Sequence, residues 1–141
     1  MPGKFMSKAD VTSAVLDWGH LQWLSNPPAT GARQLTVIAG DIFPGKGHAF
    51  HRHPDQEEVI FIVAGEIEQW IERERRVLRP GDSAFIPAGV VHASFNAGAG
   101  EARLLAILSP CAGEVGIEQE DVSTEAPWNT LRDNDADTLR S

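Results

Sequence analysis

The chain has 141 residues, a formal net charge of −8 from twelve Lys and Arg against twenty Asp and Glu, and one cysteine, Cys111. This length suits a single domain, and the excess of acids argues against nucleic-acid binding, which depends on Lys and Arg contacts to phosphate. No apolar run is long enough to span a membrane, no apolar leader opens the chain, and the lone cysteine fits a reducing compartment. We therefore predict a cytoplasmic protein with no nucleic-acid or membrane partner.

Short runs rich in β-branched and aromatic residues, separated by glycine and proline, follow one another along most of the chain. This pattern is typical of an all-β sandwich or barrel. The charged run Glu72–Arg76 is predicted to be a solvated turn. The predicted strands are Val15–Leu24, Arg33–Phe43, Ala49–His53, Glu58–Val63, Glu66–Glu72, Ser83–Ile86, Val91–Asn96 and Ala102–Leu108.

Charge and strand pattern together divide the chain into three regions. We predict an N-terminal extension over residues 1–14, a single barrel domain over 15–113 and an acidic C-terminal tail over 114–141. The tail holds eight acids and two bases, so most of the net negative charge lies there. Trp128, in this tail, is expected to anchor it to the barrel.

The predicted strand Glu58–Val63 is apolar at both parities. A strand with one face in water would alternate between apolar and polar residues, so we expect both faces of this one to be covered. One cover is the interior of the domain, and the other is a second sheet or another subunit. Trp70, which shares its parity with acidic neighbours, is expected to be partly exposed. Together these features predict a homodimer.

Three histidines and one glutamate form the pattern that points to chemistry. Alternate residues of a strand point the same way, so His51 and His53 share one face. Glu58 follows His53 by five residues, and His92 lies in a later strand. Three imidazoles and a carboxylate that converge inside a barrel suit one divalent transition metal, namely Fe, Mn, Ni, Cu, Co or Zn. Four protein ligands would leave two positions of an octahedral ion for water, oxygen or substrate.

The spacing of these residues resembles the two sequence motifs of the cupin superfamily, in particular its small single-domain members. The first motif is matched by Gly45, His51, His53, Glu58 and Gly65, and the second by Gly81, Pro87, Gly89, His92 and Asn96. Fifteen residues separate the two motifs. The resemblance implies a double-stranded β-helix (jelly-roll) barrel. It also assigns metal binding to His51, His53, Glu58 and His92.

Fold does not settle function, because cupins include oxygenases, isomerases, lyases, storage proteins and sensors. Our leading expectation is a metal-dependent dioxygenase that acts on a small organic molecule, since the inward neighbours Ile60, Ile62 and Val90 are apolar. The first alternative is a metal-dependent isomerase or lyase of a sugar or keto acid, for which Ser94 and Gln69 are the few polar candidates in the pocket. The second alternative is a small-molecule binding module without turnover.

The remaining candidates receive modest roles. His48 is expected to be exposed to solvent rather than to line the barrel mouth, and Cys111 to be a buried structural thiol rather than a nucleophile. Trp18 and Trp23 are expected to cover the outside of a sheet. No separate catalytic base stands out, so Glu58 or His48 would have to move any proton.

Overall fold

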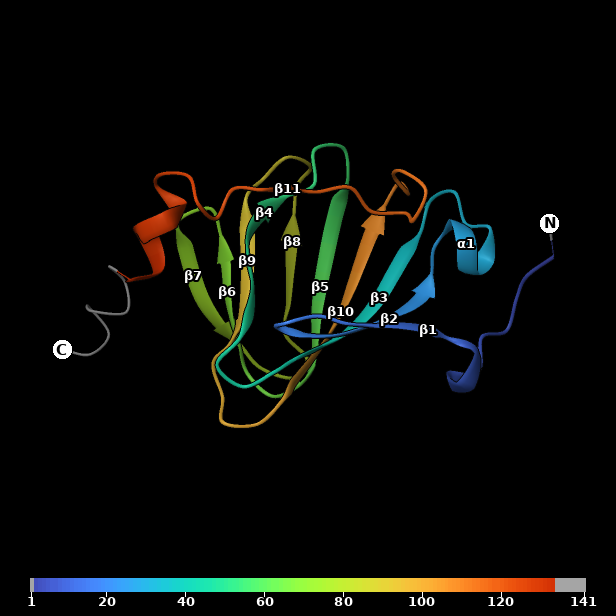
Figure 1. Cartoon of the computed structure of the whole chain (residues 1–141), viewed down its shortest axis with the longest axis horizontal. Helices are drawn as coiled ribbons and strands as arrows, with labels where there is room; N and C mark the ends of the chain where they lie inside the picture. The colour runs from blue at the N-terminus through green and yellow to red at the C-terminus, as the bar shows by residue number, and fades with distance from the viewer. Residues whose placement is uncertain (1, 134–141) are drawn as a thin grey trace.

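The computed structural model describes residues 2–133, and its strands form two antiparallel sheets that face each other (Figure 1). This architecture confirms the expected all-β jelly-roll barrel. The larger sheet has the order β1 (Thr12–Val15), β2 (Gly19–Ser25), β3 (Thr36–Ile42), β10 (Ala102–Ser109), β5 (Glu57–Ala64) and β8 (Ser83–Ile86). The smaller sheet has the order β11 (Glu120–Asp121), β4 (Gly47–Arg52), β9 (His92–Asn96), β6 (Ile67–Ile71) and β7 (Glu74–Leu78).

Helical structure is short and lies at the periphery. A 3₁₀ turn spans Lys8–Asp10, α1 spans Pro27–Thr30, and residues 128–133 are helical. None of the helices within residues 2–133 combines the length and apolar character needed to cross a bilayer. The site is therefore positioned by strands and loops.

Strand β5 shows how the sequence places its side chains. Its burial alternates strictly, so that Glu58, Ile60 and Ile62 point into the barrel while the residues between them point outward. The inward residues join a core that the two sheets share, made of Ile42, Ile60, Ile62, Ile67, Ile86, Ala102 and Leu104. Glu58 therefore sits at one end of an apolar row.

The outer face of the smaller sheet is covered by Val122, Trp128 and Leu131 of the C-terminal part of the chain. In Figure 1 this part runs along the upper ends of the strands to the helix beside β7. Trp70 lies on this face and is only 1 % exposed, packed with Phe50 and flanked by Trp128. Its indole nitrogen donates to Glu68, whose carboxylate also accepts from Arg132 at 2.8 Å. The expectation that Trp70 is partly exposed is therefore wrong, because a segment distant in sequence packs over it.

The outer face of the larger sheet is different. Val59, Phe61, Val63 and Phe85 are 37 %, 38 %, 42 % and 54 % exposed. Among residues 2–133, no second sheet covers this face, so of the two outer covers that the sequence allowed, another subunit stays a prediction. Only the inward face packs against the core.

Two predicted elements have different boundaries in the structure. The region expected as one strand, Val15–Leu24, contains the last residue of β1, a turn and most of β2, which pairs with β1 as a hairpin. The run expected as a solvated turn, Glu72–Arg76, turns only at Glu72 and Arg73 and then forms β7, paired with β6. Strand β7 is the last strand of its sheet, and charged side chains are common on such edges because one side meets water.

Candidate metal centre

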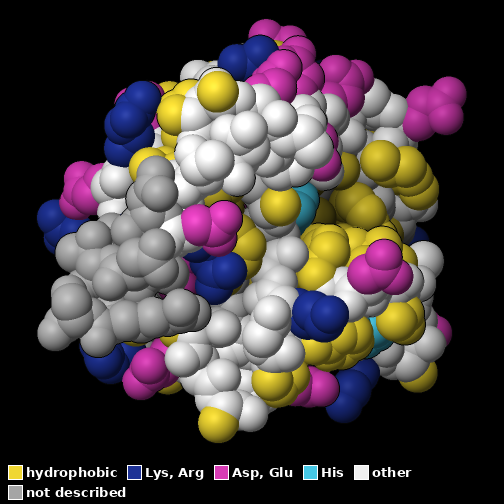
Figure 2. Space-filling view, turned by 60° about the vertical axis from the view of Figure 1, so that its left-hand side comes forward, with side chains coloured by type: hydrophobic (Ala, Val, Ile, Leu, Met, Phe, Trp, Pro, Cys, Tyr) yellow, Lys and Arg dark blue, Asp and Glu magenta, His cyan; other side chains and the backbone are white. Residues whose placement is uncertain are grey.

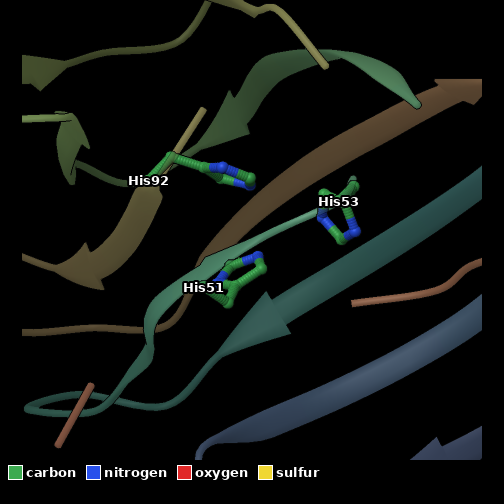
Figure 3. Close-up of side chains that lie close together, drawn as sticks. All are labelled: His51, His53 and His92. Atoms are coloured by element: carbon green, nitrogen blue, oxygen red, sulfur yellow. The ribbon is translucent and has the colours of Figure 1, made fainter. Parts of the chain in front are cut away.

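Strands β4 and β9 bring the three histidines together. His51 of β4 pairs directly with His92 of β9, and His53 follows the end of β4. All three are buried, and one ring nitrogen from each lies within 4.8 Å of the others. Figure 3 shows the three imidazoles pointing into the same space from the two strands. These residues could hold one metal ion.

Each imidazole is oriented by the backbone. The Nδ1 atom of every ring lies within hydrogen-bond distance of a carbonyl oxygen: 2.6 Å from Ala49 for His51, 2.9 Å from Glu118 for His53 and 3.0 Å from Val90 for His92. When Nδ1–H donates to these carbonyls, the Nε2 lone pair is left to face the centre. This arrangement is the usual second layer around metal-binding histidines, and it fixes both tautomer and ring orientation.

Glu58 completes the cluster. Its Oε1 atom lies 2.9 Å from Nε2 of His92 and 3.3 Å from Nε2 of His53. Within residues 2–133, Oε1 of Glu58 and Nε2 of His92 are fully buried and have no hydrogen-bond partner. Buried polar atoms without partners are costly, and a divalent cation would satisfy both. The structure thus brings all four predicted residues together, in an arrangement that fits a transition metal.

The electrostatics favour the metal-binding forms of His51 and Glu58 but not that of His53. Burial lowers the pKa of His51 well below its usual 6.5, so this imidazole is neutral near pH 7. Burial alone would raise the pKa of Glu58, but the adjacent imidazoles of His53 and His92 lower it below its ordinary value. Burial alone would lower the pKa of His53, but the Glu58 carboxylate raises it instead. A neutral imidazole and an ionised carboxylate are the forms that bind metal.

A cavity of about 260 Å³ opens onto the cluster. Its walls are largely apolar and include Trp18, Leu21, Trp23, Ile38, Ile60 and Leu104. Figure 2 shows hydrophobic side chains gathered around visible histidine side chains on one face of the molecule. Trp18 and Trp23 therefore line the cavity and do not cover the outside of a sheet as expected. Ser94 also lines it, whereas Gln69 lies behind and accepts from the Ser94 hydroxyl at 2.6 Å.

His48 lies in this cavity wall, so the expectation of a solvent-exposed side chain is wrong. Its ring is stacked between Trp18 and His51, with ring centroids 4.7 Å and 3.7 Å away. In a regular strand, residues three apart face opposite sides. A bulge in the β4–β9 pairing between His48 and His51 adds one residue and returns His48 to the inner face. Burial lowers the pKa of His48 to about 4.

A family model described as "Cupin domain" matches residues 40–108. Polyketide synthase CurC of Streptomyces cyaneus is 33 % identical over 109 residues, which cover 77 % of this chain and 70 % of CurC. The chain belongs to the cupin family. Quercetin 2,3-dioxygenase of Bacillus subtilis is 40 % identical over 75 residues, which cover 44 % of this cupin and 22 % of that protein. The structure of KdgF from Halomonas sp. shares the fold, with a TM-score of 0.67 and 18 % identity over 76 % of this chain and 94 % of KdgF.

One wall of the cupin site comes from beyond the matched region. We call residues 114–121 the strap. Its strand β11 pairs with β4, and Glu120 forms a salt bridge of 2.8 Å with Arg52. Ile117 and Gln119 line the cavity, while the carbonyl of Glu118, between them, accepts from His53. The acidic region that the sequence set apart as a tail therefore contributes directly to the candidate site.

Gln56 fixes the strap to the barrel. It is fully buried; its Nε2 donates to the carbonyls of Pro110 at 2.7 Å and Gly116 at 2.9 Å, and its Oε1 accepts from the Glu118 amide at 3.1 Å. No sequence pattern distinguished Gln56, because its role depends on a segment more than fifty residues later.

Replacing Gln56 by leucine is expected to weaken the fold and the metal site together. The change removes the hydrogen bonds to Pro110, Gly116 and Glu118, of which only the Gly116 carbonyl keeps another donor, the Thr36 hydroxyl. A polar group left unsatisfied in the interior costs about 1–3 kcal/mol. Because the strap orients His53, we also expect metal affinity to fall about tenfold or more. Urea denaturation and competition with a chromogenic chelator measure the two effects.

The matched control is Gln22→Leu. In the wild type, the amide oxygen of Gln22 accepts from Arg103 on the larger sheet, outside the cavity. This variant should keep the metal affinity of the wild type. Wild-type metal affinity in folded Gln56→Leu protein would show that the strap does not position His53.

Proposed function

We propose that this cupin is a metal-dependent dioxygenase that acts on a small, largely apolar, ring-bearing molecule. The observation that carries this proposal is a cavity with apolar walls that ends on His51, His53, His92 and Glu58. We propose these four side chains as the ligands of one divalent ion, with Fe, Mn, Ni, Cu or Co as candidates for a redox reaction and Zn for a non-redox one.

The roles of the protein follow from the cavity. A bound redox-active ion would supply activation of O₂ and of a substrate oxygen at the positions the four ligands leave free. Walls such as Trp23, Ile38 and Leu104 exclude water and bind the apolar face of a ring. A dioxygenase places both atoms of O₂ in the organic product, so one O₂ is consumed for each substrate and no separate reductant is needed.

The comparison with quercetin 2,3-dioxygenase supports this reading, because that protein is named for oxygenation of a flat, polyphenolic molecule. The apolar walls argue against the sugar alternative, since a sugar needs hydrogen-bonding groups for its many hydroxyls. One such candidate, the Ser94 hydroxyl, already donates to Gln69.

A second candidate is metal-dependent chemistry without oxygen, such as cyclisation or lysis of a carbonyl compound. The observation in its favour is the similarity to CurC, whose name assigns it to polyketide synthesis. Both candidates use a metal as an electron-withdrawing centre for a substrate oxygen. They differ in whether O₂ is consumed.

An oxygen electrode separates the candidates. We expect Fe(II)- or Mn-loaded protein to show substrate-dependent O₂ uptake with at least one member of a panel of flavonols, catechols, thiols and β-diketones. Zn-loaded protein and the His51→Ala/His92→Ala double variant should show none. Turnover by Zn-loaded protein under strict anaerobiosis would establish the non-redox candidate instead. No turnover, combined with ligand-induced thermal shifts, would point to a binding module.

We also propose that this cupin forms a homodimer through the outer face of its larger sheet. Residues paired across antiparallel strands point to the same side. The register aligns one apolar row, Phe85, Val59, Ile107 and Val37, beside a second, Phe61, Leu105 and Ala39. A contiguous apolar face on a sheet favours burial against a partner, and a two-fold axis would bury it against its own copy.

Charging this face is expected to produce monomers. A Val59→Lys/Phe61→Lys variant places two cations where the apolar rows would meet, so light scattering should report about 15 kDa in place of about twice the 15.3 kDa chain mass. Ser13→Lys adds a cation to the exposed first strand of the same sheet and should leave the dimer intact. A wild-type mass of 15 kDa at micromolar concentration would exclude the dimer.

The other expectations about this cupin's setting also stay proposals. The cytoplasm rests on the single cysteine, and the absence of nucleic-acid and membrane partners rests on charge and hydropathy. A small-molecule ligand rests on the cavity. The division at residues 14/15 and 113/114 remains a proposal as well.

A further inference from the structure

We infer that His48 and Gln119 form an oxygen-binding subsite beside the metal ligands, and that the substrate therefore carries two nearby oxygens on one planar apolar skeleton. One oxygen would bind at the metal centre and the other at this pair. The inference rests on the proposed function, since it assumes that the substrate binds in the cavity next to the four proposed ligands.

The two side chains contact each other in the cavity wall. Nε2 of His48 lies 3.4 Å from Nε2 of Gln119, at the long limit of a hydrogen bond. Within residues 2–133, this is the only hydrogen bond that either side chain makes. Both line an otherwise largely apolar cavity. They can therefore exchange a weak mutual contact for stronger bonds to a ligand oxygen.

The ring of His48 and the backbone on either side of Gln119 are held in place before any ligand arrives. The ring of His48 is confined between Trp18 and His51, at interplanar angles of 11° and 15°. Gln119 lies on the strap between Glu118, whose amide and carbonyl are both bonded, and Glu120, which pairs with Arg52. Groups fixed in this way lose little entropy when a ligand binds.

The position of the pair favours two substrate oxygens that lie close together. The His48 ring lies 3.7 Å from the ring of His51, so a ligand atom at His48 is also close to the metal ligands. Oxygens on adjacent carbons, or on the facing peri positions of a fused ring, match this short separation. The apolar walls accept the remainder of the skeleton. The substrate class is thus a flat molecule with a pair of neighbouring hydroxyl or carbonyl groups.

Ser94, another hydrogen-bonding side chain in the cavity, provides a contrast. Its hydroxyl donates to Gln69 at 2.6 Å, and Gln69 in turn donates to the carbonyl of Trp70 at 3.1 Å. The Ser94 proton therefore already has a partner within the protein. This difference makes Ser94 a control residue of the same cavity.

The test compares two probes that differ by one oxygen, 1,8-dihydroxynaphthalene and 1-naphthol, by calorimetry on Zn-loaded protein in oxygen-free buffer. One good neutral hydrogen bond corresponds to roughly three- to tenfold in affinity, so we expect the wild type to prefer the diol by about that factor. His48→Phe keeps an aromatic ring between Trp18 and His51 but removes both nitrogens, and Gln119→Leu removes the amide. Each variant should lose most of the preference and leave the affinity for 1-naphthol within about twofold.

Three control measurements accompany this comparison. Metal content and thermal stability of each variant show that the site and fold are intact, and Ser94→Ala should retain the preference for the diol. An unchanged preference in both His48→Phe and Gln119→Leu would overturn the subsite while leaving the proposed function standing. Failure of metal-loaded wild-type protein to bind either naphthol would overturn the proposed substrate class, and the subsite with it.

Discussion

Replacing any one of His51, His53 and His92 by alanine is expected to remove stoichiometric metal binding. Each imidazole supplies one of three nitrogens that lie within 4.8 Å of one another, and each is pre-oriented by a backbone carbonyl. Losing a single outer-layer partner already costs about 10–100-fold in metal affinity, so loss of a ligand itself should cost more. Metal analysis of purified protein, followed by chelator competition, measures the effect.

The matched control is His20→Ala. His20 lies 3.6 Å from Asp41 on the larger sheet and does not line the cavity, so this variant should keep full metal content. Glu58→Gln should weaken binding less than loss of an imidazole, because three nitrogens remain. Full occupancy in a His51→Ala/His92→Ala double variant would refute the site.

Metal affinity is expected to fall as the pH is lowered, beginning above pH 6.5. The Glu58 carboxylate raises the pKa of His53 above 6.5, so in the metal-free protein His53 holds its proton to a higher pH than an ordinary imidazole. Metal must displace that proton, and displacement of one proton lowers the apparent affinity about tenfold per pH unit below this pKa. His51 competes only at lower pH, since burial lowers its pKa well below 6.5.

Chelator competition from pH 8 to pH 5 checks this dependence. Glu58→Gln removes the charge that raises the pKa of His53, so in this variant the decline should begin at lower pH. An affinity that is constant between pH 8 and pH 6 would contradict the prediction.

The pH dependence of the free energy of unfolding of the metal-free protein tests the pKa shifts of the histidines independently. His48 and His51 have lowered pKa values in the folded state, so below pH 6.5 the unfolded chain binds more protons. The free energy of unfolding should then fall by about 1.4 kcal/mol per pH unit for each such proton. His53 acts in the opposite sense: its contribution is present below pH 6.5 and is lost as the pH rises through its folded pKa.

The strand pattern was accessible from sequence because it is local, and the four candidate metal-site residues because they stand at fixed positions of the two cupin motifs. Period-two burial in β5 and the spacing of His51, His53 and Glu58 depend only on neighbouring residues. The misplacement of Trp70 has a different cause. Its parity gives a face, but whether that face is covered depends on Trp128, which packs there only in the folded chain.

The residues of the cavity wall were also hard to predict from sequence, because their positions depend on contacts between distant segments. His48 reaches the inner face because of a bulge in β4, and a bulge shifts every parity argument by one residue. Gln56 and Gln119 carried no signal, since an isolated glutamine is ordinary in sequence and gains its role only where the strap meets the barrel.

In the strap, the orientation of His53 and the choice of ligand depend on different groups, although mutation usually changes two such properties together. The bond that orients His53 comes from the main chain at Glu118, so the side chain at that position can vary without removing the acceptor. The side chains on either side, Ile117 and Gln119, face the cavity and take no part in that bond. Substitutions at Ile117 and Gln119 can therefore change ligand preference while His53 stays in place. Ligand selectivity can thus be altered in this short stretch, by evolution or by engineering, without loss of the candidate metal site.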